Sequence, residues 1–414
     1  MAFGQDGFHH ILLSGYDKFT NYELQKHGNA AMKCLVTGGA GFIGSHTVDA
    51  LLERGYEVRI LDNLSKPVHL MGKPDYIPQK AEFILGDVRN RDDWEKALDG
   101  VDVVIHLAAY QDYMPDFSKF FHVNSVGTAL LYEIIIEKKL PIQKVVVASS
   151  QAVYGEGKYR CPQCNRIKFP DLREVEHLEA GQWNHYCQDC GTLLQAMWTN
   201  ENRVNPQNQY ALSKYSQEQV SINLGKRYQV PTTCLRYSIV QGPRQSIYNA
   251  YSGACRIFCL STFFDQPIPV YEDGKQQRDF VNIQDVVNAN LAVLDSSASD
   301  YQVYNVGGGK TYSVMEFATI VTKVFNKNIP PLITENYRFG DTRHIFSDIS
   351  KLKFLGWKPL HAVEESIASY VEWLKKMDRV ENILEKAASK MKSMNVVRAR
   401  KMARGEVQAA TTFA

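Results

Sequence analysis

Short apolar runs alternate with amphipathic helical stretches through the first half of the chain. Residues 34–36 (CLV) form an apolar run typical of a buried parallel strand, and residues 42–54 follow with the periodicity of an amphipathic helix. The same alternation continues downstream, where further strands are expected at 56–61, 82–85, 101–107 and 144–148. Alternation of strand and helix predicts an α/β fold with a Rossmann-type, doubly wound parallel sheet.

A glycine-rich turn lies between the first strand and the first helix. Gly38, Gly41 and Gly44 are spaced three apart, and each has a physical reason: a tight turn, room for a phosphate, and close helix–strand contact. A strand, glycine turn and helix present backbone N–H groups and a positive helix end to a pyrophosphate. Glycine turns also occur in ordinary loops, so the interpretation depends on the residues at the ends of the later strands.

An acidic residue lies at the expected distance. Asp62 ends the second strand, 18 residues after Gly44. A carboxylate there accepts hydrogen bonds from a ribose 2′-OH and repels a 2′-phosphate, which favours NAD over NADP. The alternative is that Asp62 is only a surface turn residue.

The ends of the later strands carry further small or polar residues. Asp87 follows the third strand and is expected near the adenine amino group, while Ala108 and Ala109 let the backbone approach a cofactor. Ser150 follows the fifth strand. Because the carboxyl ends of parallel strands bind ligands in open α/β sheets, these positions predict one site along that edge.

Tyr210 and Lys214 are four residues apart on a predicted helix and so project from one face. A neighbouring ammonium lowers the pKa of a phenol, and Tyr210 is therefore a candidate general base. Taken alone, such a pair on a helix is most often a solvated surface pair.

Composition restricts the class of protein. The 414 residues are 44% hydrophobic and 22% charged, with a net charge of +2, which are values of a globular protein without general attraction to nucleic acid or membrane surfaces. No apolar run approaches membrane-spanning length, and the N-terminus lacks a secretory pattern, so a cytoplasmic location is expected. The length predicts two domains rather than one.

Several motifs together resemble the extended short-chain dehydrogenase/reductase family, and within it the nucleotide-sugar epimerases and dehydratases. The co-linear motifs are 37–44 (TGGAGFIG), 106–109 (HLAA), 149–155 (SSQAVYG), 210–214 (YALSK), 242–244 (GPR), 278–281 (RDFV) and 338–341 (RFGD). The resemblance covers roughly residues 32–373 apart from one insertion. It is closest to the dTDP-rhamnose 4-epimerase-like and UDP-glucose 4-epimerase-like members.

The resemblance implies a role for each matching residue. Tyr210 would be the catalytic base, Lys214 would hold the nicotinamide ribose, and Ser150 would hydrogen-bond the reacting sugar oxygen. The residues expected to contact NAD are Gly38, Gly41, Phe42, Ile43, Gly44, Asp62, Asn63, Ser65, Asp87, Val88, Leu107, Ala108, Ala109, Asn124, Tyr210, Lys214 and Tyr237. The residues expected to contact a UDP-, dTDP- or GDP-hexose are Ser150, Asn249, Tyr271, Arg278 and Arg338, with the two arginines on the diphosphate. Surface ion pairing is the alternative for the arginines, and an ordinary core position is the alternative for Tyr271.

Two positions after Ser150 favour one reaction within this family. The family's 4,6-dehydratases carry Asp-Glu where this chain has Gln151 and Ala152, neither of which transfers protons. The resemblance therefore implies an epimerase that inverts C4 of the sugar through a 4-keto intermediate. Ile239 replaces an Asn of related 4-epimerases, so the substrate phosphate is expected to be placed differently. A dehydratase or reductase of the same fold remains the alternative, and a zinc-ribbon scaffold with an inactive Rossmann domain is the non-enzymatic one.

The insertion lies between Ser150 and Tyr210, which are 60 positions apart. It contains Cys161-x-x-Cys164 and Cys187-x-x-Cys190, with 22 residues between the two pairs, a spacing that predicts a structural Cys₄ zinc ribbon. Two disulfides or a redox pair are the alternatives. His185 is expected to be a bystander, and the ribbon itself a lid or interface element beside the active site.

The expected organisation follows from these assignments. Residues 1–31 form an N-terminal extension, 32–235 the NAD-binding domain with the insertion at 156–205, 236–375 the substrate domain, and 376–414 a basic helical tail. Residues 362–394 are expected to be helical with a solvated charged face. A homodimer is the expected assembly.

Overall fold

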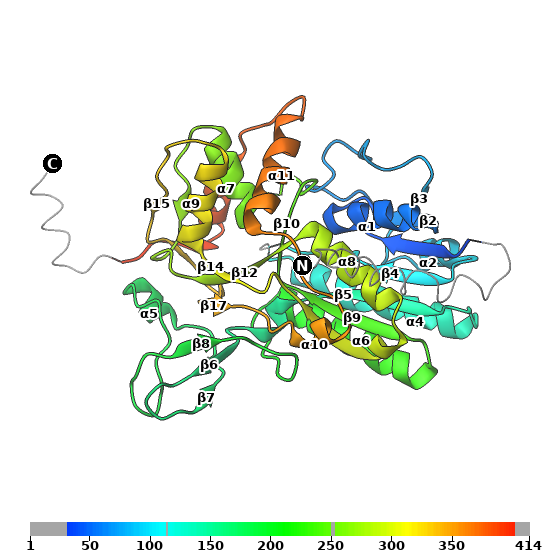
Figure 1. The fold of residues 1–414 in the computed structure, drawn as a ribbon, viewed down its shortest axis with the longest axis horizontal. Coiled ribbons are helices and arrows are strands. Elements are labelled where there is room, and N and C mark those ends of the chain that lie inside the picture. The colour runs from blue at the N-terminus through cyan, green and yellow to red at the C-terminus, as the bar shows by residue number, and fades with distance from the viewer. Residues whose placement is uncertain (1–30, 113–114, 250–252, 402–414) are drawn as a thin grey trace, which may run out of the picture.

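A parallel sheet of seven strands forms the centre of the larger part of the molecule (Figure 1). The computed structural model describes residues 31–112, 115–249 and 253–401. The strand order is β13-β9-β5-β4-β1-β2-β3, and all six pairings are parallel. The strands are β1 (Lys33–Thr37), β2 (Glu57–Asp62), β3 (Glu82–Leu85), β4 (Val103–His106), β5 (Lys144–Ser150), β9 (Thr232–Tyr237) and β13 (Gln302–Val306). The predicted doubly wound parallel sheet is confirmed.

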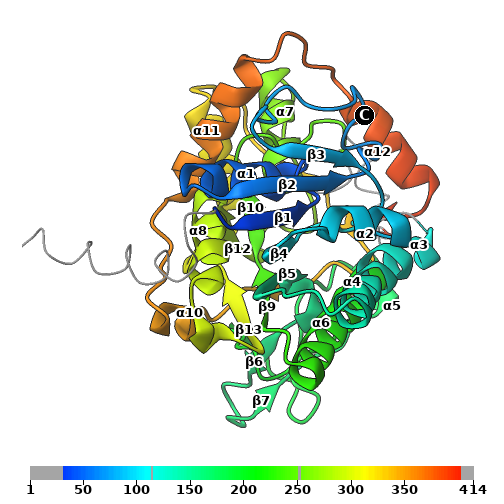
Figure 2. The same cartoon turned by 90° about the vertical axis from the view of Figure 1, so that its right-hand side faces the viewer.

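Helices cover both faces of this sheet (Figure 2). On one face lie α1 (Phe42–Glu53) and α8 (Ile283–Leu294), and on the other α2 (Arg91–Leu98), α4 (Gly127–Glu137) and α6 (Gln209–Tyr228). Successive strand residues point to opposite faces, so Cys34 and Val36 pack with α1 and α8 while Leu35 packs with α2 and α4. This burial on both sides explains why the strands are apolar without alternation.

A second, mixed sheet forms the smaller part of the molecule. It contains β10 (Ile239–Gln241), β12 (Gln277–Asn282) and β14 (Thr311–Ser313), with β17 (His344–Ile345) also paired to β12. Three helices pack around it: α7 (Ala254–Phe263), α9 (Val314–Val324) and α11 (Val363–Lys375). The rings of Phe280 and Phe317 stack within this core, with their centroids 4.1 Å apart.

The insertion forms its own three-stranded sheet, which lies below the smaller part in Figure 1. Its strands run in the order β7 (Ile167–Lys168), β6 (Lys158–Arg160) and β8 (Gln195–Met197), and it includes the short helix α5 (Val175–Glu179).

The remaining elements are α3 (Phe117–Phe121), a π-helical turn (His122–Val126), 3₁₀ turns (Gln151–Tyr154 and Ser297–Ser299), β11 (Pro269–Val270), β15 (Leu332–Ile333), β16 (Tyr337–Arg338), α10 (Ser350–Phe354), α12 (Leu384–Ser393) and β18 (Val397–Arg398).

The two parts interleave along the chain. β13 and α8 belong to the seven-stranded sheet and its covering layer, although both fall within the region 236–375 predicted as a separate substrate domain. A boundary at 235 is therefore too simple, because the chain returns to the sheet before completing the smaller part.

The C-terminal region also differs from the prediction. The single helix expected over 362–394 is two helices, α11 and α12, separated by an extended path. Met377, Val380 and Ile383 of the connecting chain pack with Leu260 of α7 and Leu374 of α11. Residues 1–30 and 402–414, part of the predicted extension and tail, lie outside the described residues. No helix in the described ranges has the length and apolar character needed to cross a bilayer.

Candidate active site

The glycine-rich turn joins β1 to α1 at the carboxyl edge of the sheet. Gly38 has a φ of +68°, and a Cβ there would lie 2.8 Å from the backbone nitrogen of Ala108. A Cβ on Gly44 would lie 2.1 Å from the Gly38 carbonyl oxygen, so α1 approaches the turn too closely for any side chain. Gly41 is the N-cap of α1 and has no side chain to cap the first turn. The turn thus has the geometry with which a helix N-terminus binds a pyrophosphate.

Asp62 is fixed against this turn. Its Oδ2 accepts a hydrogen bond from the Ala40 nitrogen at 3.0 Å, and its Oδ1 accepts one from the Leu64 nitrogen at 2.9 Å. A simple turn residue would account for the second contact but not for the first. Each carboxylate oxygen has a second lone pair, so these contacts leave Asp62 able to accept ribose hydroxyls.

Asp87 lies beside the residue that follows Asp62. Asn63 Nδ2 donates to Asp87 Oδ2 at 2.9 Å, and the Arg89 guanidinium donates to both carboxylate oxygens. These bonds from Arg89 lower the pKa of Asp87 to about 2, so it is ionised at neutral pH. Ser65 donates its backbone N–H to Asn63, whereas Val88 packs in the core against Trp94. Contact of these residues with adenine stays a prediction.

A buried polar network supports the backbone where β4 ends. Thr37 Oγ1 lies 2.6 Å from His106 Nδ1, and His106 Nε2 lies 2.9 Å from Thr128 Oγ1. The Ala108 nitrogen donates to Thr37 Oγ1 at 3.1 Å. Burial lowers the pKa of His106 to about 3, so the imidazole is neutral and its two nitrogens bond one hydroxyl each. This network holds the backbone of residues 107–109, expected at the cofactor, in a fixed position.

Asn124 is buried behind this edge rather than exposed on it. Its Oδ1 accepts from the Tyr110 nitrogen at 2.8 Å, and its Nδ2 donates to Ser213 Oγ at 2.9 Å. Asn124 therefore ties the segment after β4 to α6. In this position it shapes the site from behind, and its direct contact with a cofactor stays a prediction.

Ser150 and Tyr210 both face one cavity. Ser150 ends β5 and caps the 3₁₀ turn that comes next, where its Oγ accepts from the Ala152 nitrogen at 3.2 Å. Tyr210 lies in the first turn of α6, which begins where the Asn208 side chain accepts from the Ala211 nitrogen at 2.9 Å. A strand end and a capped helix start thus bring together two residues that are far apart in sequence.

Lys214 extends from α6 toward the sheet and is 2% exposed. Its Nζ donates to the Ala148 carbonyl oxygen and to Gln217 Oε1, both at 2.8 Å. Burial lowers the pKa of Lys214 to about 7. The alternative of a solvated surface pair is therefore wrong for Lys214.

The cavity has a volume of about 900 Å³ and lies between the two parts of the molecule. Phe42 and Ile43, at the start of α1, line it on the side of the seven-stranded sheet. Tyr271, Arg278 and Arg338 line it on the side of the smaller part. Members of both predicted sets thus line one cavity, although most of the residues expected to contact NAD, among them Gly38, Asp62 and Ala108, are not in its lining.

The two arginines are held by backbone oxygens and by ring contacts. Arg278 donates to the carbonyl oxygens of Thr342 and Arg343 at 2.7 and 3.0 Å. The Arg338 guanidinium lies over the Tyr271 ring, 5.3 Å from its centroid. Backbone oxygens rather than a surface ion pair hold Arg278 among the described residues, and Tyr271 is a half-buried wall residue rather than part of the core.

Gln151, Ala152 and Ile239 also line the cavity. The positions that distinguish a dehydratase from an epimerase are therefore in the site, and neither carries an acid. The Gln151 Oε1 atom is buried and has no hydrogen-bond partner among the described residues. A ligand hydroxyl would supply such a partner.

Asn249 and Tyr237 also lie differently from the expectation. Asn249 is not among the described residues that line the cavity, and its Oδ1 is buried without a hydrogen-bond partner in the described ranges. Tyr237 lines the cavity but donates its hydroxyl to Asn290 Oδ1 at 2.6 Å, so its phenol belongs to the core.

Sequence reasoning missed the wall supplied by the C-terminal region. Ala387, Ala388 and Met391 of α12 line the cavity, as does Arg398 of β18. The signal was present, because Leu384, Ala387, Ala388 and Met391 are spaced as the apolar face of a helix. Lysines on the other face hid this pattern. The lysine side chains are exposed as predicted, but the prediction of a solvated face missed the apolar face of α12.

A buried ionic cluster joins the insertion to the wall that carries the arginines. Arg173 donates to Glu272 Oε2 at 2.9 Å and to the Asp341 carbonyl oxygen at 2.7 Å. The backbone nitrogen of Arg343 donates to Glu156 Oε2 at 2.7 Å. The guanidinium of Arg343 donates to Glu272 Oε2. All four charged side chains are at most 6% exposed. The insertion is thus bonded directly to the segment whose carbonyl oxygens hold Arg278.

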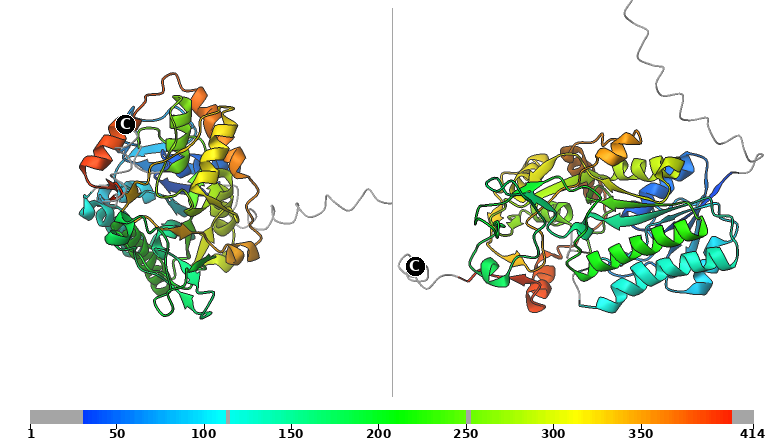
Figure 3. Two further views of the ribbon diagram at one scale, coloured as in Figure 1. Left: turned by 90° about the vertical axis from the view of Figure 1, so that its left-hand side faces the viewer. Right: turned by 90° about the horizontal axis from the view of Figure 1, so that it is seen from below.

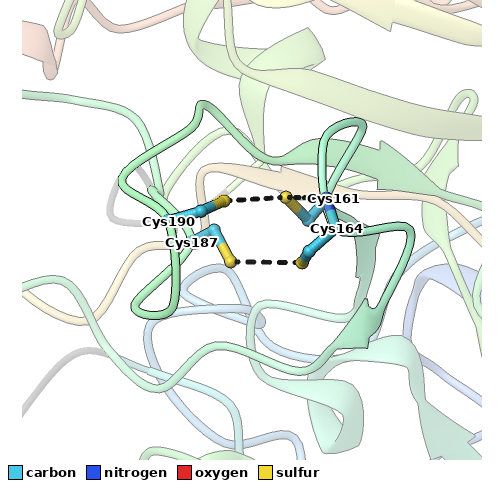
Figure 4. Close-up of side chains that lie close together, drawn as sticks. All are labelled: Cys161, Cys164, Cys187 and Cys190. Carbon is cyan, nitrogen blue, oxygen red and sulfur yellow. Dashed lines mark hydrogen bonds between the residues drawn. The ribbon is translucent and has the colours of Figure 1, made fainter.

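The four cysteines of the insertion converge on one point (Figure 4). Their sulfur atoms all lie within 4.8 Å of one another, and the nearest pairs are Cys161–Cys190 at 3.4 Å and Cys164–Cys187 at 3.7 Å. None of the four forms a disulfide. His185 instead lies 3.1 Å from Glu156, outside this group of sulfur atoms.

Comparison with known proteins gives one consistent family. The model of the NAD dependent epimerase/dehydratase family matches residues 34–174 and 190–307, with the gap inside the insertion. The dTDP-L-rhamnose 4-epimerase of Burkholderia thailandensis is 32% identical over 355 residues, covering 84% of this chain and 96% of that protein. A putative UDP-glucose 4-epimerase of Methanocaldococcus jannaschii is 34% identical over 351 residues, which cover 83% of this chain and 99% of that protein.

Solved structures agree. The UDP-glucuronic acid 4-epimerase from Bacillus cereus, in complex with UDP-glucuronic acid and NAD, has a TM-score of 0.69 at 26% identity, covering 83% of this chain and 99% of that one. The UDP-N-acetylglucosamine 4-epimerase from Methanobrevibacter ruminantium M1 has a TM-score of 0.67 at 29% identity, covering 84% and 99%. With a family model over more than half of its length and relatives above 30% identity, the chain belongs to the NAD-dependent epimerase/dehydratase family.

Proposed function

We propose that this protein is an NAD-dependent epimerase that inverts C4 of a nucleotide-diphosphate hexose. One observation carries the proposal: Ser150 and Tyr210 line the same cavity as Arg278 and Arg338, while Gln151 and Ala152 offer no acid for removing water. The names of the relatives, several of them sugar-nucleotide 4-epimerases, support the same reaction.

The residues present fit NAD. The glycine turn leaves the start of α1 uncapped by any side chain, and Asp62 stands at the end of the adjacent strand with lone pairs for ribose hydroxyls. NAD, when bound, supplies a hydride acceptor and then a hydride donor for the sugar carbon.

Tyr210 performs the proton transfers in this proposal. Its phenolate takes the proton of the C4 hydroxyl as the C4–H bond is broken, and it returns that proton after the 4-keto sugar has turned. The Ser150 hydroxyl hydrogen-bonds the reacting oxygen, and the charge of protonated Lys214 favours the phenolate. No water is lost or gained, so no acid is needed at Gln151 or Ala152.

The opposite wall would hold the nucleotide diphosphate. Guanidinium groups pair well with phosphate oxygens, which suits Arg278 and Arg338, and the Tyr271 ring offers a face for a base. UDP-, dTDP- and GDP-hexoses all present these groups.

Proton NMR of the product tests the reaction. The purified protein is incubated with a panel of UDP-, dTDP- and GDP-hexoses, and inversion at C4 without loss of water is expected for at least one. Tyr210→Phe should lower kcat by about 10²- to 10⁴-fold, the usual contribution of a general base, and should keep its NAD. Tyr228→Phe, at the exposed end of the same helix, is the control and should match the wild type. A 4-keto-6-deoxy product, or full activity of Tyr210→Phe, would contradict the proposal.

We also propose that Cys161, Cys164, Cys187 and Cys190 bind one structural zinc ion. Two Cys-x-x-Cys turns bring four unlinked sulfur atoms within 4.8 Å of one another, which suits a tetrahedral site without an open position. Elemental analysis of freshly purified protein should give one zinc per chain. Less than a tenth of an equivalent, with four reactive thiols, would rule the site out.

The cytoplasmic location, the homodimer and the division into an NAD-binding and a substrate-binding region stay proposals. Light scattering at several concentrations tests the homodimer, for which a mass twice that of the 47.0 kDa chain is expected.

A further inference from the structure

The C-terminal segment of residues 384–401 forms one wall of the cavity described above. Ala387, Ala388 and Met391 lie on the cavity side of α12. Ala388 is exposed although it lines the cavity, so its methyl group faces the open space rather than the protein core. Tyr271 and Arg338, the residues proposed above for a base and a diphosphate, line the same cavity.

Arg338 is held by this segment through both its backbone and its side chain. β18 pairs with β16 in antiparallel register, with Val397 opposite Arg338. The guanidinium of Arg338 donates to the Met391 sulfur at 3.7 Å. The position of this arginine therefore depends on the C-terminal segment as well as on its own strand.

The segment is anchored at both ends. At its start, Leu384 packs with Ile247 and Leu260 in an apolar cluster beside α7. At its end, Lys401 bonds Glu179 of the insertion through both its ammonium and its backbone nitrogen, at 2.6 and 2.9 Å. Figure 3 shows the C-terminal segment beside the insertion. These anchors fix α12 as a wall and distinguish it from a loose tail.

We propose that residues 384–401 are part of the substrate-binding site and close the end of the cavity that takes a nucleoside diphosphate, with Ala388 contacting the nucleotide and Met391 positioning Arg338. The small alanine side chains leave room for the ligand, and the apolar face of α12 and the Tyr271 ring, which line the same cavity, suit a planar base. The identity of the ligand depends on the proposed function, but the role of the segment is tested by binding alone.

Calorimetric titration of the full chain with UDP, dTDP and GDP gives the first test. At least one of these nucleoside diphosphates should bind the wild type. Ala388→Trp should weaken that binding at least tenfold, because the indole fills part of the cavity. Ser389→Trp is the matched control, since Ser389 is the next residue of α12, is exposed, and is not among the described residues that line the cavity. It should bind within twofold of the wild type. All three proteins should carry the same amount of NAD and melt at the same temperature.

The outcomes separate this inference from the proposed function. Equal binding by the wild type and both tryptophan variants would overturn the inference and leave the epimerase proposal intact. Failure of all three nucleoside diphosphates to bind the wild type would overturn both. Tenfold weaker binding by Ala388→Trp in a protein that epimerises none of the sugars tested would uphold the segment's role and contradict only the reaction.

Met391 is tested as a positioning residue. Met391→Ala should raise KM for the nucleotide-sugar several-fold more than it lowers kcat, because Met391 contacts Arg338, which is proposed to bind the diphosphate. Met391→Leu keeps most of the packing volume, so its KM should lie close to the wild-type value. Equal changes in kcat and KM, together with a lower melting temperature, would indicate a purely structural role and contradict this assignment.

Discussion

Lys214 lies in an environment unlike that of an ordinary, solvated lysine. It is buried against the sheet with two acceptors, the Ala148 carbonyl oxygen and Gln217 Oε1, and no carboxylate is among its hydrogen-bond partners in the described structure. Desolvation therefore lowers its pKa to about 7. Its charge, on which activation of Tyr210 depends in the proposed mechanism, is thus poised near neutral pH.

This shift predicts a pH dependence of stability. An unfolded lysine keeps its proton up to a pKa of about 10.4, so between pH 7 and pH 10 the unfolded chain binds a proton that the folded chain has released. Stability should rise with pH across this window, by at most about 1.4 kcal/mol per pH unit. Urea unfolding of the NAD-free protein at pH 7.0 and 9.5 measures this change in the free energy of unfolding.

Lys214→Met is the comparison that isolates this residue. It removes the titrating group at similar length, and the rise in unfolding free energy from pH 7.0 to 9.5 should be smaller than in the wild type. The loss of two hydrogen bonds lowers the stability of the variant equally at both pH values. The comparison therefore uses only the change in unfolding free energy between pH 7.0 and pH 9.5. The same rise in both proteins would show that Lys214 keeps an ordinary pKa.

Individual residues were predictable where a motif fixes them to an element end. Ser150 follows a strand and Tyr210 begins a helix, and both reach the cavity as expected. The buried position of Asn124 was not predictable by the same reasoning, and its contact with a cofactor stays a prediction. Its partners, Tyr110 and Ser213, come from two other segments, and a sequence does not reveal which buried hydrogen bonds an amide makes.

At the scale of elements, the contact between β1, the glycine turn and α1 is tightly constrained. The Cβ of Gly44→Ala would lie 2.1 Å from the Gly38 carbonyl oxygen, so the turn must shift. We expect a loss of about 1–3 kcal/mol, as for overpacking in general, and a marked loss of bound NAD. Glu53→Ala, at the other end of the same helix, should change stability by less than about 0.5 kcal/mol. Urea unfolding and the NAD content after purification measure both, and an unchanged NAD content in Gly44→Ala would contradict the assignment of this turn.

The buried ionic cluster is the second contact between elements that can be tested. Arg173→Met leaves Glu156 and Glu272 short of a partner, a change that typically costs about 3–5 kcal/mol. Because Arg173 also holds the Asp341 carbonyl oxygen, the wall that carries Arg278 should loosen. We expect KM for the nucleotide-sugar to rise about tenfold while NAD content is unchanged, since about 1.4 kcal/mol of lost binding corresponds to that factor.

Arg166→Met is the matched control within the insertion. Arg166 pairs with Asp189 at 3.0 Å on the surface, and its side chain is 67% exposed, so its loss should cost less than about 1 kcal/mol. KM should stay at the wild-type value. If Arg173→Met had the same KM as this control, the cluster would not contribute to the substrate wall.

For the whole molecule, the alternation of strands and helices was enough to predict a doubly wound parallel sheet, because its central strands β1, β4 and β5 are buried on both faces. The path of the chain between the two parts was not predictable in this way. The pairing of β13 with β9 depends on Val303, Tyr304 and Val306, a short run that resembles many other strands. The closure of the cavity by α12 depends on contacts with α7 and α5, elements more than a hundred residues away in sequence.

Removal of the proposed zinc ion is the prediction that concerns the whole molecule. The insertion is bonded to the substrate wall through Arg173 and to the C-terminal segment through Glu179, whereas the proposed NAD contacts lie on the far side of the cavity. Dialysis against a chelator should therefore raise KM for the nucleotide-sugar and lower the melting temperature, with NAD still bound. Hydrogen exchange should speed up in β6, β8 and residues 337–345, and stay slow in β1, β4 and β5. Loss of NAD in step with the metal would show that the insertion supports the sheet instead, and unchanged exchange throughout would show that the cysteine cluster braces neither part.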